Sequence, residues 1–261
     1  MRITVLGSGT SHGIPSVGCH CDVCASADPR DTRSRCSVAI HWQDKTLLVD
    51  TPPELRQQVI RSQIRQVDAL LFTHAHADHI FGLDDVRRFN EMQGGEMPVF
   101  ARPDVLEELQ RAFRYVFITT QVGGGKPQLA LQPLEGDRLE WEGLTIETIP
   151  VFHGNYPITA FRVGDFAYVT DTSRIPEESL ERLRGLDTLI LDALRWEPHP
   201  THFNIEEALA VVEELRPRRT FFTHLAHTVS HAETERRLPE SVRLAYDGLI
   251  LNVPDPAGPR D

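Results

Sequence analysis

The sequence predicts a layered α/β fold, in which short buried strands alternate with helices. Apolar runs of four to eight residues recur along the chain, with the length and composition of buried strands. Several of these runs end on Asp or His, and ligands in layered α/β folds bind at the carboxyl ends of the strands. The length of 261 residues is sufficient for one large domain with a sizeable core. We therefore expect a single domain over residues 1–261, with a functional site at one edge of its sheets.

In the first half of the chain we expect strands at residues 2–7, 36–40, 46–50, 69–72 and 98–101. Residues 36–50 should form a hairpin that turns at residues 43–45. A helix should follow from about Pro53, because proline suits the first turn of a helix. Further helices are expected at 80–90 and from Asp104, near the helix cap, to about Tyr115. The glycine-rich segment 121–127, which contains Gly123, Gly124 and Gly125, is interpreted as a spacer rather than a lid.

In the second half the predicted strands end on potential ligands. Residues 145–152 lead into His153, 166–170 into Asp171, 188–191 into Asp192, and 220–223 into His224. A helix is expected at 205–215. There is also a faint internal repeat, because Phe72-Thr73-His74 recurs as Phe222-Thr223-His224, which suggests two halves of related design.

The strongest functional signal is a cluster of four potential metal ligands directly after the apolar run 69–72. His74, His76, Asp78 and His79 are separated only by alanines. In an extended turn His74 and His76 project the same way, and Asp78 and His79 reach a neighbouring position. One turn can therefore serve two metal ions, the arrangement used in two-metal hydrolysis.

The ligands at the other strand ends complete two sites. We assign His74, His76 and His153 to one ion and Asp78, His79 and His224 to the other, with Asp171 as a bridge. Divalent metals lower the pKa of a bound water towards ~7, which makes a bridging hydroxide the expected nucleophile. His153 or His224 alone could be core histidines and Asp171 a helix cap, but these readings leave the cluster without partners. Asp50 and Asp192 either orient metal-binding histidines or cap the next element.

All four cysteines precede residue 40. Cys19, Cys21 and Cys24 form a C-x-C-x-x-C knuckle in a loop at about 18–36. Three thiolates at this spacing can occupy three corners of a tetrahedral zinc site, and the fourth ligand must come from elsewhere. The alternative is three free thiols in a loop.

The composition narrows the classes of partner. The net charge is −11, with 38 acidic against 27 basic residues, which argues against a nucleic-acid polymer because phosphate binding requires Lys and Arg. No apolar run reaches the ~18 residues of a membrane span. The N-terminus runs directly into a strand pattern without a signal-peptide cleavage region. We expect a cytoplasmic protein that acts on a small anionic substrate and has no membrane partner; a homodimer is left open.

These motifs resemble, in order, those of metallo-β-lactamase-fold hydrolases, and the resemblance covers essentially the whole chain. Three features are similar to the phosphoribosyl cyclic phosphate phosphodiesterases of phosphonate breakdown. They are the cysteine knuckle after the turn that begins at Gly9, a second histidine, His227, three residues after His224, and His202 upstream of the helix 205–215.

The resemblance implies an αββα sandwich with two facing mixed sheets flanked by helices. It also implies a structural zinc held by Cys19, Cys21, Cys24 and His227, which leaves Cys36 as a buried thiol. His202 becomes the general acid, and Asp78 is counted with it among the catalytic residues. His199 is the rival proton donor, but it lies between two prolines, which favours a role in the loop.

The function we expect is metal-dependent hydrolysis of small phosphodiesters, with cyclic phosphates such as phosphoribosyl 1,2-cyclic phosphate as candidates. Two divalent ions (Zn or Mn) would act in the active site, beside one structural Zn. The alternatives are a nuclease like those that process tRNA 3′ ends, a thioesterase or lactonase of the same fold, and a non-catalytic metal-binding accessory protein.

Overall fold

The computed structural model describes residues 1–119 and 125–256, and within these ranges the strands form two seven-stranded mixed sheets. The first sheet has the order β14 (Ile250–Asn252), β1 (Arg2–Gly7), β2 (Ser37–Trp42), β3 (Lys45–Val49), β4 (Ala69–Leu71), β5 (Met97–Ala101) and β6 (Leu129–Pro133). The second has the order β13 (Val242–Leu244), β12 (Arg219–Thr223), β11 (Thr188–Asp192), β10 (Phe166–Val169), β9 (Tyr156–Val163), β8 (Leu144–His153) and β7 (Arg138–Trp141).

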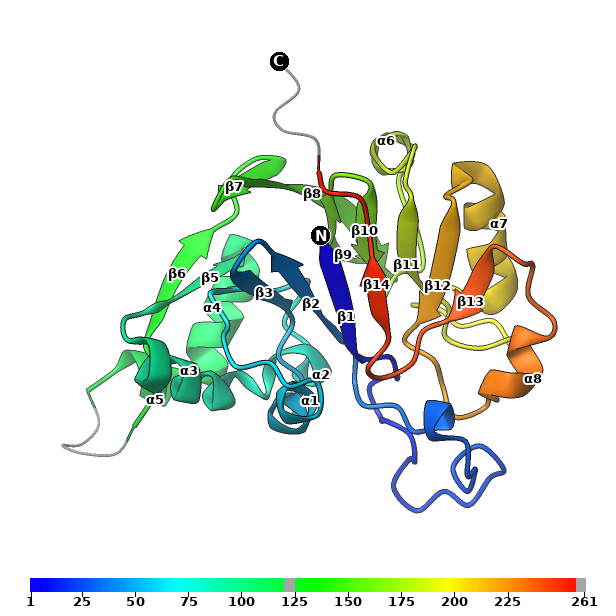
Figure 1. The fold of residues 1–261 in the computed structure, drawn as a ribbon, viewed down its shortest axis with the longest axis horizontal. Helices are drawn as coiled ribbons and strands as arrows, with labels where there is room; N and C mark the ends of the chain where they lie inside the picture. Colours follow the sequence, from blue (N-terminus) through cyan, green and yellow to red (C-terminus); the bar gives the residue numbers. More distant parts are fainter. Residues whose placement is uncertain (120–124, 257–261) are drawn as a thin grey trace.

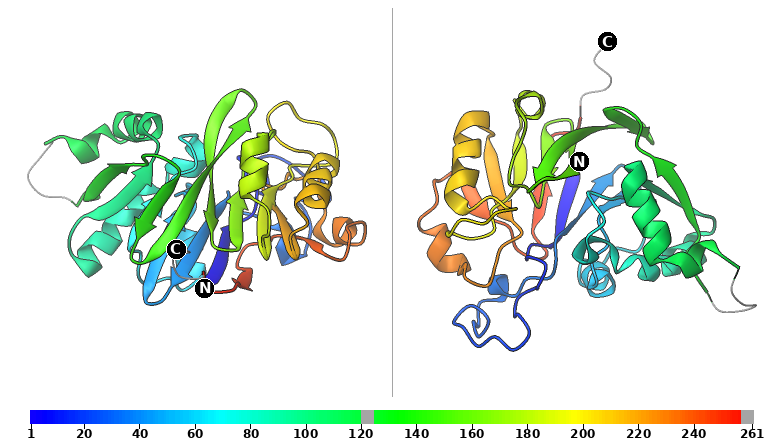
Figure 2. Two further views of the ribbon diagram at one scale, coloured as in Figure 1. Left: turned by 90° about the horizontal axis from the view of Figure 1, so that it is seen from above. Right: turned by 180° about the vertical axis from the view of Figure 1, so that it is seen from behind.

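The helices cover the outer faces of the two sheets (Figures 1 and 2). The first sheet is covered by α1 (Leu55–Arg61), α2 (Ala77–Ile80), α3 (Arg87–Gln93), α4 (Pro103–Ala112) and α5 (Arg114–Phe117). The second is covered by α6 (Glu177–Arg182), α7 (Ile205–Leu215) and α8 (His231–Glu235). Short 3₁₀ helices η1 (Pro29–Asp31) and η2 (Leu83–Val86) lie in the connections. The predicted αββα sandwich is confirmed.

Three apolar layers hold this sandwich together. Strand β3 shows why the strands are apolar on both faces: Leu47 and Val49 point into the layer between the two sheets, and Leu48 points into the layer beneath the helices of the first sheet. In the second sheet Ile190 faces the central layer and Leu189 the layer under α6 and α7. Strands buried on both faces lose the polar alternation of a half-exposed strand, which is why they are visible in the sequence as continuous apolar runs.

Both sheets contain a parallel part whose strand ends carry the predicted ligands. Strands β3 to β6 are parallel, as are β10 to β13. The loop after β4 contacts the residues after β10 and β12, since His79 lies 3.3 Å from Asp171 and Asp78 lies 3.8 Å from His224. The carboxyl ends of the two sheets therefore meet at one edge of the sandwich.

The predicted helix 205–215 agrees with α7, which begins at a capping box formed by Asn204 and Glu207. The helix predicted at 80–90 is instead divided into the end of α2, η2 and α3. The division falls at Gly82, whose backbone packs so closely that an added Cβ would lie 2.0 Å from the Pro52 carbonyl oxygen. The sequence analysis also did not identify β6, β7, β9, β13 and β14. Part of the glycine-rich segment 121–127 falls outside the described residues.

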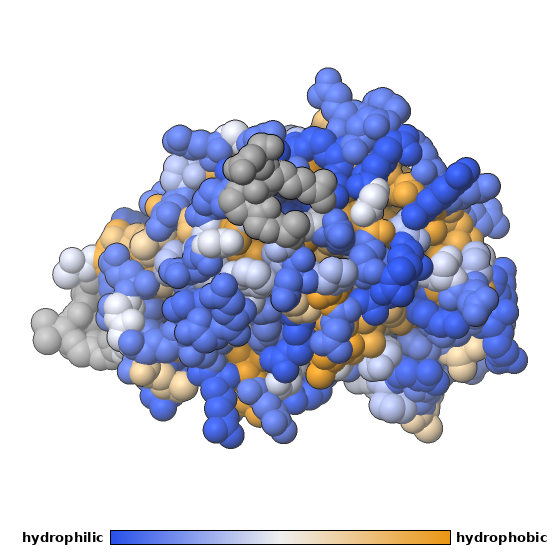
Figure 3. Space-filling model, turned by 45° about the horizontal axis from the view of Figure 1, so that its top comes forward, coloured by the Kyte–Doolittle hydropathy of each residue, from blue (hydrophilic) through white to orange (hydrophobic). Residues whose placement is uncertain are grey.

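The two ends of the described chain lie side by side, because β1 pairs with β14 in an antiparallel arrangement (Figure 1). The face shown in Figure 3 is mainly hydrophilic, with apolar areas scattered between polar side chains. Within residues 1–119 and 125–256, no helix has the length and apolar character required to cross a membrane.

Candidate metal centres

The loop after β4 and the first turn of α2 bring the four clustered ligands together. His74 and His79 are fully buried, and Asp78 is nearly so. The Nε2 atom of His74 lies 3.0 Å from Nδ1 of His76, so these two side chains project the same way, as predicted. Oδ2 of Asp78 lies 3.4 Å from Nε2 of His79.

The partners of this loop come from three strands of the second sheet. His153 is the last residue of β8, and Asp171 and His224 follow β10 and β12. Oδ2 of Asp171 lies 3.3 Å from Nε2 of His79, 3.3 Å from Nε2 of His224 and 3.9 Å from Nε2 of His74. One oxygen of Asp171 therefore faces histidines of both predicted sets, which is the placement that a bridging carboxylate requires.

Both predicted sets are assembled in the fold. Ligand atoms of Asp78, His79, Asp171 and His224 all lie within 4.8 Å of one another, so this set is at coordination spacing. In the other set the ring of His153 lies with its centroid 5.9 Å from that of His74 and 5.2 Å from that of His76.

Neighbouring groups fix the orientation of these histidines from behind. The Nδ1 atom of His79 pairs with Asp50 at 2.7 Å, that of His153 with the Thr201 carbonyl oxygen at 2.8 Å, and that of His74 with the Thr73 hydroxyl at 3.0 Å. With Nδ1 engaged, Nε2 is the nitrogen that remains for an ion. Such partners are typical of metal-binding histidines.

The backbone at the site is strained in a way the sequence does not show. Asp50, Asp171 and His224 have positive φ angles of 65°, 56° and 58°, although none of them is glycine. Asp50 and His224 follow directly after β3 and β12, and Asp171 lies two residues after the end of β10, so the left-handed conformation turns the chain where the strand ends and points the side chain into the site. Strained residues of this kind cluster at functional sites.

The donor set fits divalent cations. Nε2 of both His79 and His224 is buried without a hydrogen-bond partner in the described chain, a state that buried polar atoms rarely adopt. Burial opposes the charged form of His224, but Asp171 and Asp78 outweigh it and raise its pKa to about 9. Burial likewise opposes charge on Asp171, yet His224 and His79 hold its pKa well below the usual range. The centre therefore favours a positive charge, which metal ions would supply.

His202 lies next to this centre, in the loop between β11 and α7. Its ring stacks on that of His224 with centroids 4.6 Å apart and planes 14° apart, and its Nδ1 lies 3.1 Å from Oδ2 of Asp192. A ring nitrogen of His202 is within 4.8 Å of His153 and Asp171 ligand atoms. The rival, His199, is a loop residue whose Nδ1 accepts the backbone amide of Thr201 at 3.4 Å and lies 3.2 Å from the Thr201 hydroxyl.

The cysteine knuckle forms a second, separate cluster. Ligand atoms of Cys19, Cys21, Cys24 and His227 lie within 4.8 Å of one another, and Nδ1 of His227 is 3.3 Å from Cys19 Sγ and 3.4 Å from Cys21 Sγ. The backbone amide of Cys24, then His227, lowers the pKa of Cys21 to about 6. Three thiols and one imidazole at these distances fit a tetrahedral zinc ion. Cys36 is buried elsewhere, with its pKa raised by burial.

A buried arginine attaches the segment after the knuckle to the segment that follows β12. The guanidinium of Arg33 donates to Asp31 at 2.9 Å and to the backbone oxygen of Val229 at 2.8 Å. Asp31 in turn accepts from the backbone amide of His231 at 2.8 Å. This network connects the segment after the knuckle to the residues that follow His224 and His227.

Three residues in or beside the site were not identified from sequence: Thr73, Thr201 and Tyr156. The ring of Tyr156 stacks on His76, with centroids 5.9 Å apart. Thr201 contributes its backbone oxygen, which no side-chain pattern can reveal. Thr73 could have been identified from the sequence, because a hydroxyl directly beside the histidine cluster indicates a hydrogen-bond partner for a metal-binding histidine.

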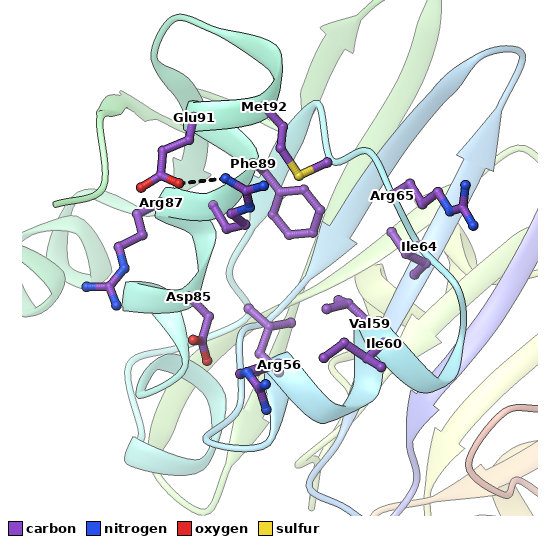
Figure 4. Close-up of a pocket in the computed structure, with 12 residues that line it drawn as sticks. Arg56, Val59, Ile60, Ile64, Arg65, Asp85, Arg87, Phe89, Glu91 and Met92 are labelled. Atoms are coloured by element: carbon purple, nitrogen blue, oxygen red, sulfur yellow. Dashed lines mark hydrogen bonds and ion pairs between the residues drawn. The ribbon is translucent and has the colours of Figure 1, made fainter. Parts of the chain in front are cut away.

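A cavity of about 570 Å³ lies away from these centres, between α1 and α3 (Figure 4). Val59, Ile60, Phe89 and Met92 contribute apolar side chains to its lining, together with arginines. None of the predicted ligands lines it.

Comparison with known proteins agrees with this geometry. Residues 45–225 match the model of the β-lactamase superfamily domain. A crystal structure described as a new diphosphatase from the PhnP family is 42% identical, covers 97% of this chain and 98% of its own, and superposes with a TM-score of 0.91. Zn²⁺-bound PqqB from Methylobacterium extorquens shares the fold at 22% identity, with a TM-score of 0.75, over 97% of this chain and all of that one.

A curated relative from Porphyromonas gingivalis, named octanoyltransferase, is 37% identical over 253 residues. The match covers 95% of this chain but 51% of that protein, so the chain spans about half the length of this relative. Taken with the fold and the ligand geometry, the comparisons show that the chain belongs to the β-lactamase superfamily and its PhnP family, and that it is a metallo-hydrolase.

Proposed function

We propose that this protein hydrolyses small phosphodiesters, with cyclic phosphates such as phosphoribosyl 1,2-cyclic phosphate as the leading candidates. The observation that carries the proposal is the position of His202. It is buried, with a ring nitrogen within 4.8 Å of ligand atoms of His153 and Asp171, and the seven residues assigned to the two ions do not include it. A histidine at this distance that is not needed as a ligand is suited to proton transfer.

The reaction breaks the bond between phosphorus and an alcohol oxygen and forms a new bond from phosphorus to a water oxygen. Divalent ions held by the seven ligands would supply positive charge for the phosphate oxygens and lower the pKa of water. An alkoxide leaves poorly without a proton, so a positioned acid is worth about 10²–10⁴ in rate. In our proposal His202 gives that proton to the departing oxygen, and His199 remains a loop residue.

A second candidate is hydrolysis of an organic diphosphate, which is favoured by the relative described as a diphosphatase. Its leaving group is a phosphate rather than an alkoxide, and a phosphate leaves without the help of an acid. The two functions therefore differ in how strongly they depend on His202. A long nucleic acid fits less well, because the net charge of −11 would repel it.

The test is a substrate panel with purified, metal-analysed protein. It should contain a cyclic phosphodiester, an organic diphosphate, bis(4-nitrophenyl) phosphate, a thioester and a β-lactam. We expect the cyclic phosphodiester to be the best substrate. Turnover of the thioester without any phosphodiester would refute the proposal.

The variant His202→Ala tests the role of the proposed acid. We expect kcat to fall by about 10²–10⁴ for the cyclic phosphodiester, and much less for bis(4-nitrophenyl) phosphate, whose leaving group needs no proton. His199→Ala is the matched control and should lose little on either substrate. Equal losses on both substrates, or loss of a bound metal ion, would show that His202 serves another purpose.

A further inference from the structure

Asp192 is fully buried at the end of β11, between two histidines with different predicted roles. Its Oδ2 lies 3.1 Å from Nδ1 of His202 and accepts the backbone amide of Thr172 at 3.0 Å. Its Oδ1 lies 3.6 Å from Nδ1 of His224, and neither of these two atoms has a hydrogen-bond partner in the described chain. One carboxylate thus faces both the proposed acid and a predicted metal ligand.

The chemistry of the carboxylate dictates which nitrogen His202 presents on its other side. A carboxylate oxygen accepts hydrogen bonds, so Nδ1 of His202, which lies 3.1 Å from Oδ2, is the nitrogen that donates to it. The ring of His202 is also stacked nearly parallel to that of His224, which holds its plane. His202 then presents Nε2 on the side away from Asp192. His199 has a different neighbour, because its Nδ1 accepts the backbone amide of Thr201 at 3.4 Å.

We infer that Asp192 is a positioning residue for the proton donor. It holds His202 in the form protonated at Nδ1 and leaves Nε2 to deliver the proton. The inference rests on the proposed function, and it goes beyond the predicted role of Asp192 as a partner of a metal ligand. The same logic applies in Ser-His-Asp triads, where an Asp→Asn change leaves the geometry intact but gives the wrong tautomer.

The first test reads the tautomer directly and does not depend on activity. Long-range ¹H–¹⁵N correlation spectra of the zinc-loaded protein, recorded at a pH where the ring is neutral, should show His202 protonated at Nδ1. The His202→Gln variant assigns the signal. In Asp192→Ala, which removes the acceptor at Nδ1, the proton should shift towards Nε2. A wild-type ring protonated at Nε2 would overturn the inference, even if the variant proved unstable.

The second test is kinetic. Asp192→Asn should lower kcat about 10²-fold for a cyclic phosphodiester, with KM nearly unchanged and less than about fivefold loss for bis(4-nitrophenyl) phosphate. In a His202→Ala background the same change should cause little further loss. Asp187→Asn is the matched control, because Asp187 immediately precedes β11 at its opposite end and pairs with Arg218; it should behave like the wild type.

The outcomes separate the inference from the proposed function. A wild type that hydrolyses neither phosphodiester but shows His202 protonated at Nδ1 would refute the function and leave the positioning role supported. Equal losses on both substrates, or additive losses with His202→Ala, would refute the positioning role. Loss of a bound metal ion in Asp192→Asn would also refute it, since Asp192 would then act through His224.

Discussion

Replacing Asp247 with alanine should lower the free energy of unfolding by about 2–6 kcal/mol. This buried carboxylate lies in the turn before β14 and ties together three distant segments. It accepts hydrogen bonds from the backbone amide and hydroxyl of Ser8, both at 2.9 Å, and of Ser34, at 2.8 and 2.6 Å. Arg61 contributes a further contact at 2.9 Å from a half-exposed side chain.

The magnitude follows from which donors can find new partners. The hydroxyls can rotate, and Arg61 can turn to water, so their loss costs little. The two backbone amides are fixed, and each hydrogen bond to a charged acceptor is worth about 1.5–3 kcal/mol, with a penalty of about 1–3 kcal/mol for a donor left unsatisfied. The penalty for two unsatisfied amides gives the range of about 2–6 kcal/mol, at its lower end if water reaches Ser34.

Urea unfolding with the metal content held constant measures this effect. Asp247→Asn should fall between the wild type and the alanine variant, because its single carbonyl oxygen still accepts. Asp44→Ala, at the exposed turn between β2 and β3, is the control and should change the stability by less than ~0.5 kcal/mol. A cost below ~1 kcal/mol for Asp247→Ala would refute the reasoning.

Two further predictions concern the metal sites. Metal analysis should find three ions per chain, and Cys21→Ser should remove one of them and lower the melting temperature. Cys36→Ser is the matched control. A wild type that holds only two ions would contradict the structural zinc site. Asp50→Ala should weaken binding of an active-site ion by about 10–100-fold, because Asp50 holds His79 at 2.7 Å. This is measured by competition with a chelator, and unchanged affinity would exclude the orienting role.

The sequence was most informative where strands are buried on both faces. Continuous apolar runs such as 69–72 are distinctive, and the ligands follow directly at their ends, so the residues that gather at the sheet edge could be named. The long strand β9 was missed although its middle is buried. Short strands β13 and β14 have too few residues to establish a period, and their place is fixed by pairing with β12 and β1.

The less predictable part of the site depends on spatial neighbours. The distance between Asp192 and His202 is set by the loop that returns from β11 to α7, which no spacing rule describes. The break at Gly82 depends on how closely the chain approaches Pro52. The fourth ligand of the knuckle could not be derived from its spacing alone, and it was named through a resemblance to a family.

The left-handed backbone at Asp50, Asp171 and His224 limits which substitutions these positions can accept. Asp and Asn enter this conformation more readily than most residues, and β-branched residues rarely do. Asp→Asn at 50 or 171 would therefore change the charge and leave the turn intact, whereas Asp→Val would also disturb the path of the strand end. At these positions the chemical role of the side chain and the left-handed backbone each restrict the choice of amino acid. A variant that keeps the side-chain chemistry but not the backbone conformation, or the reverse, should therefore not recover function.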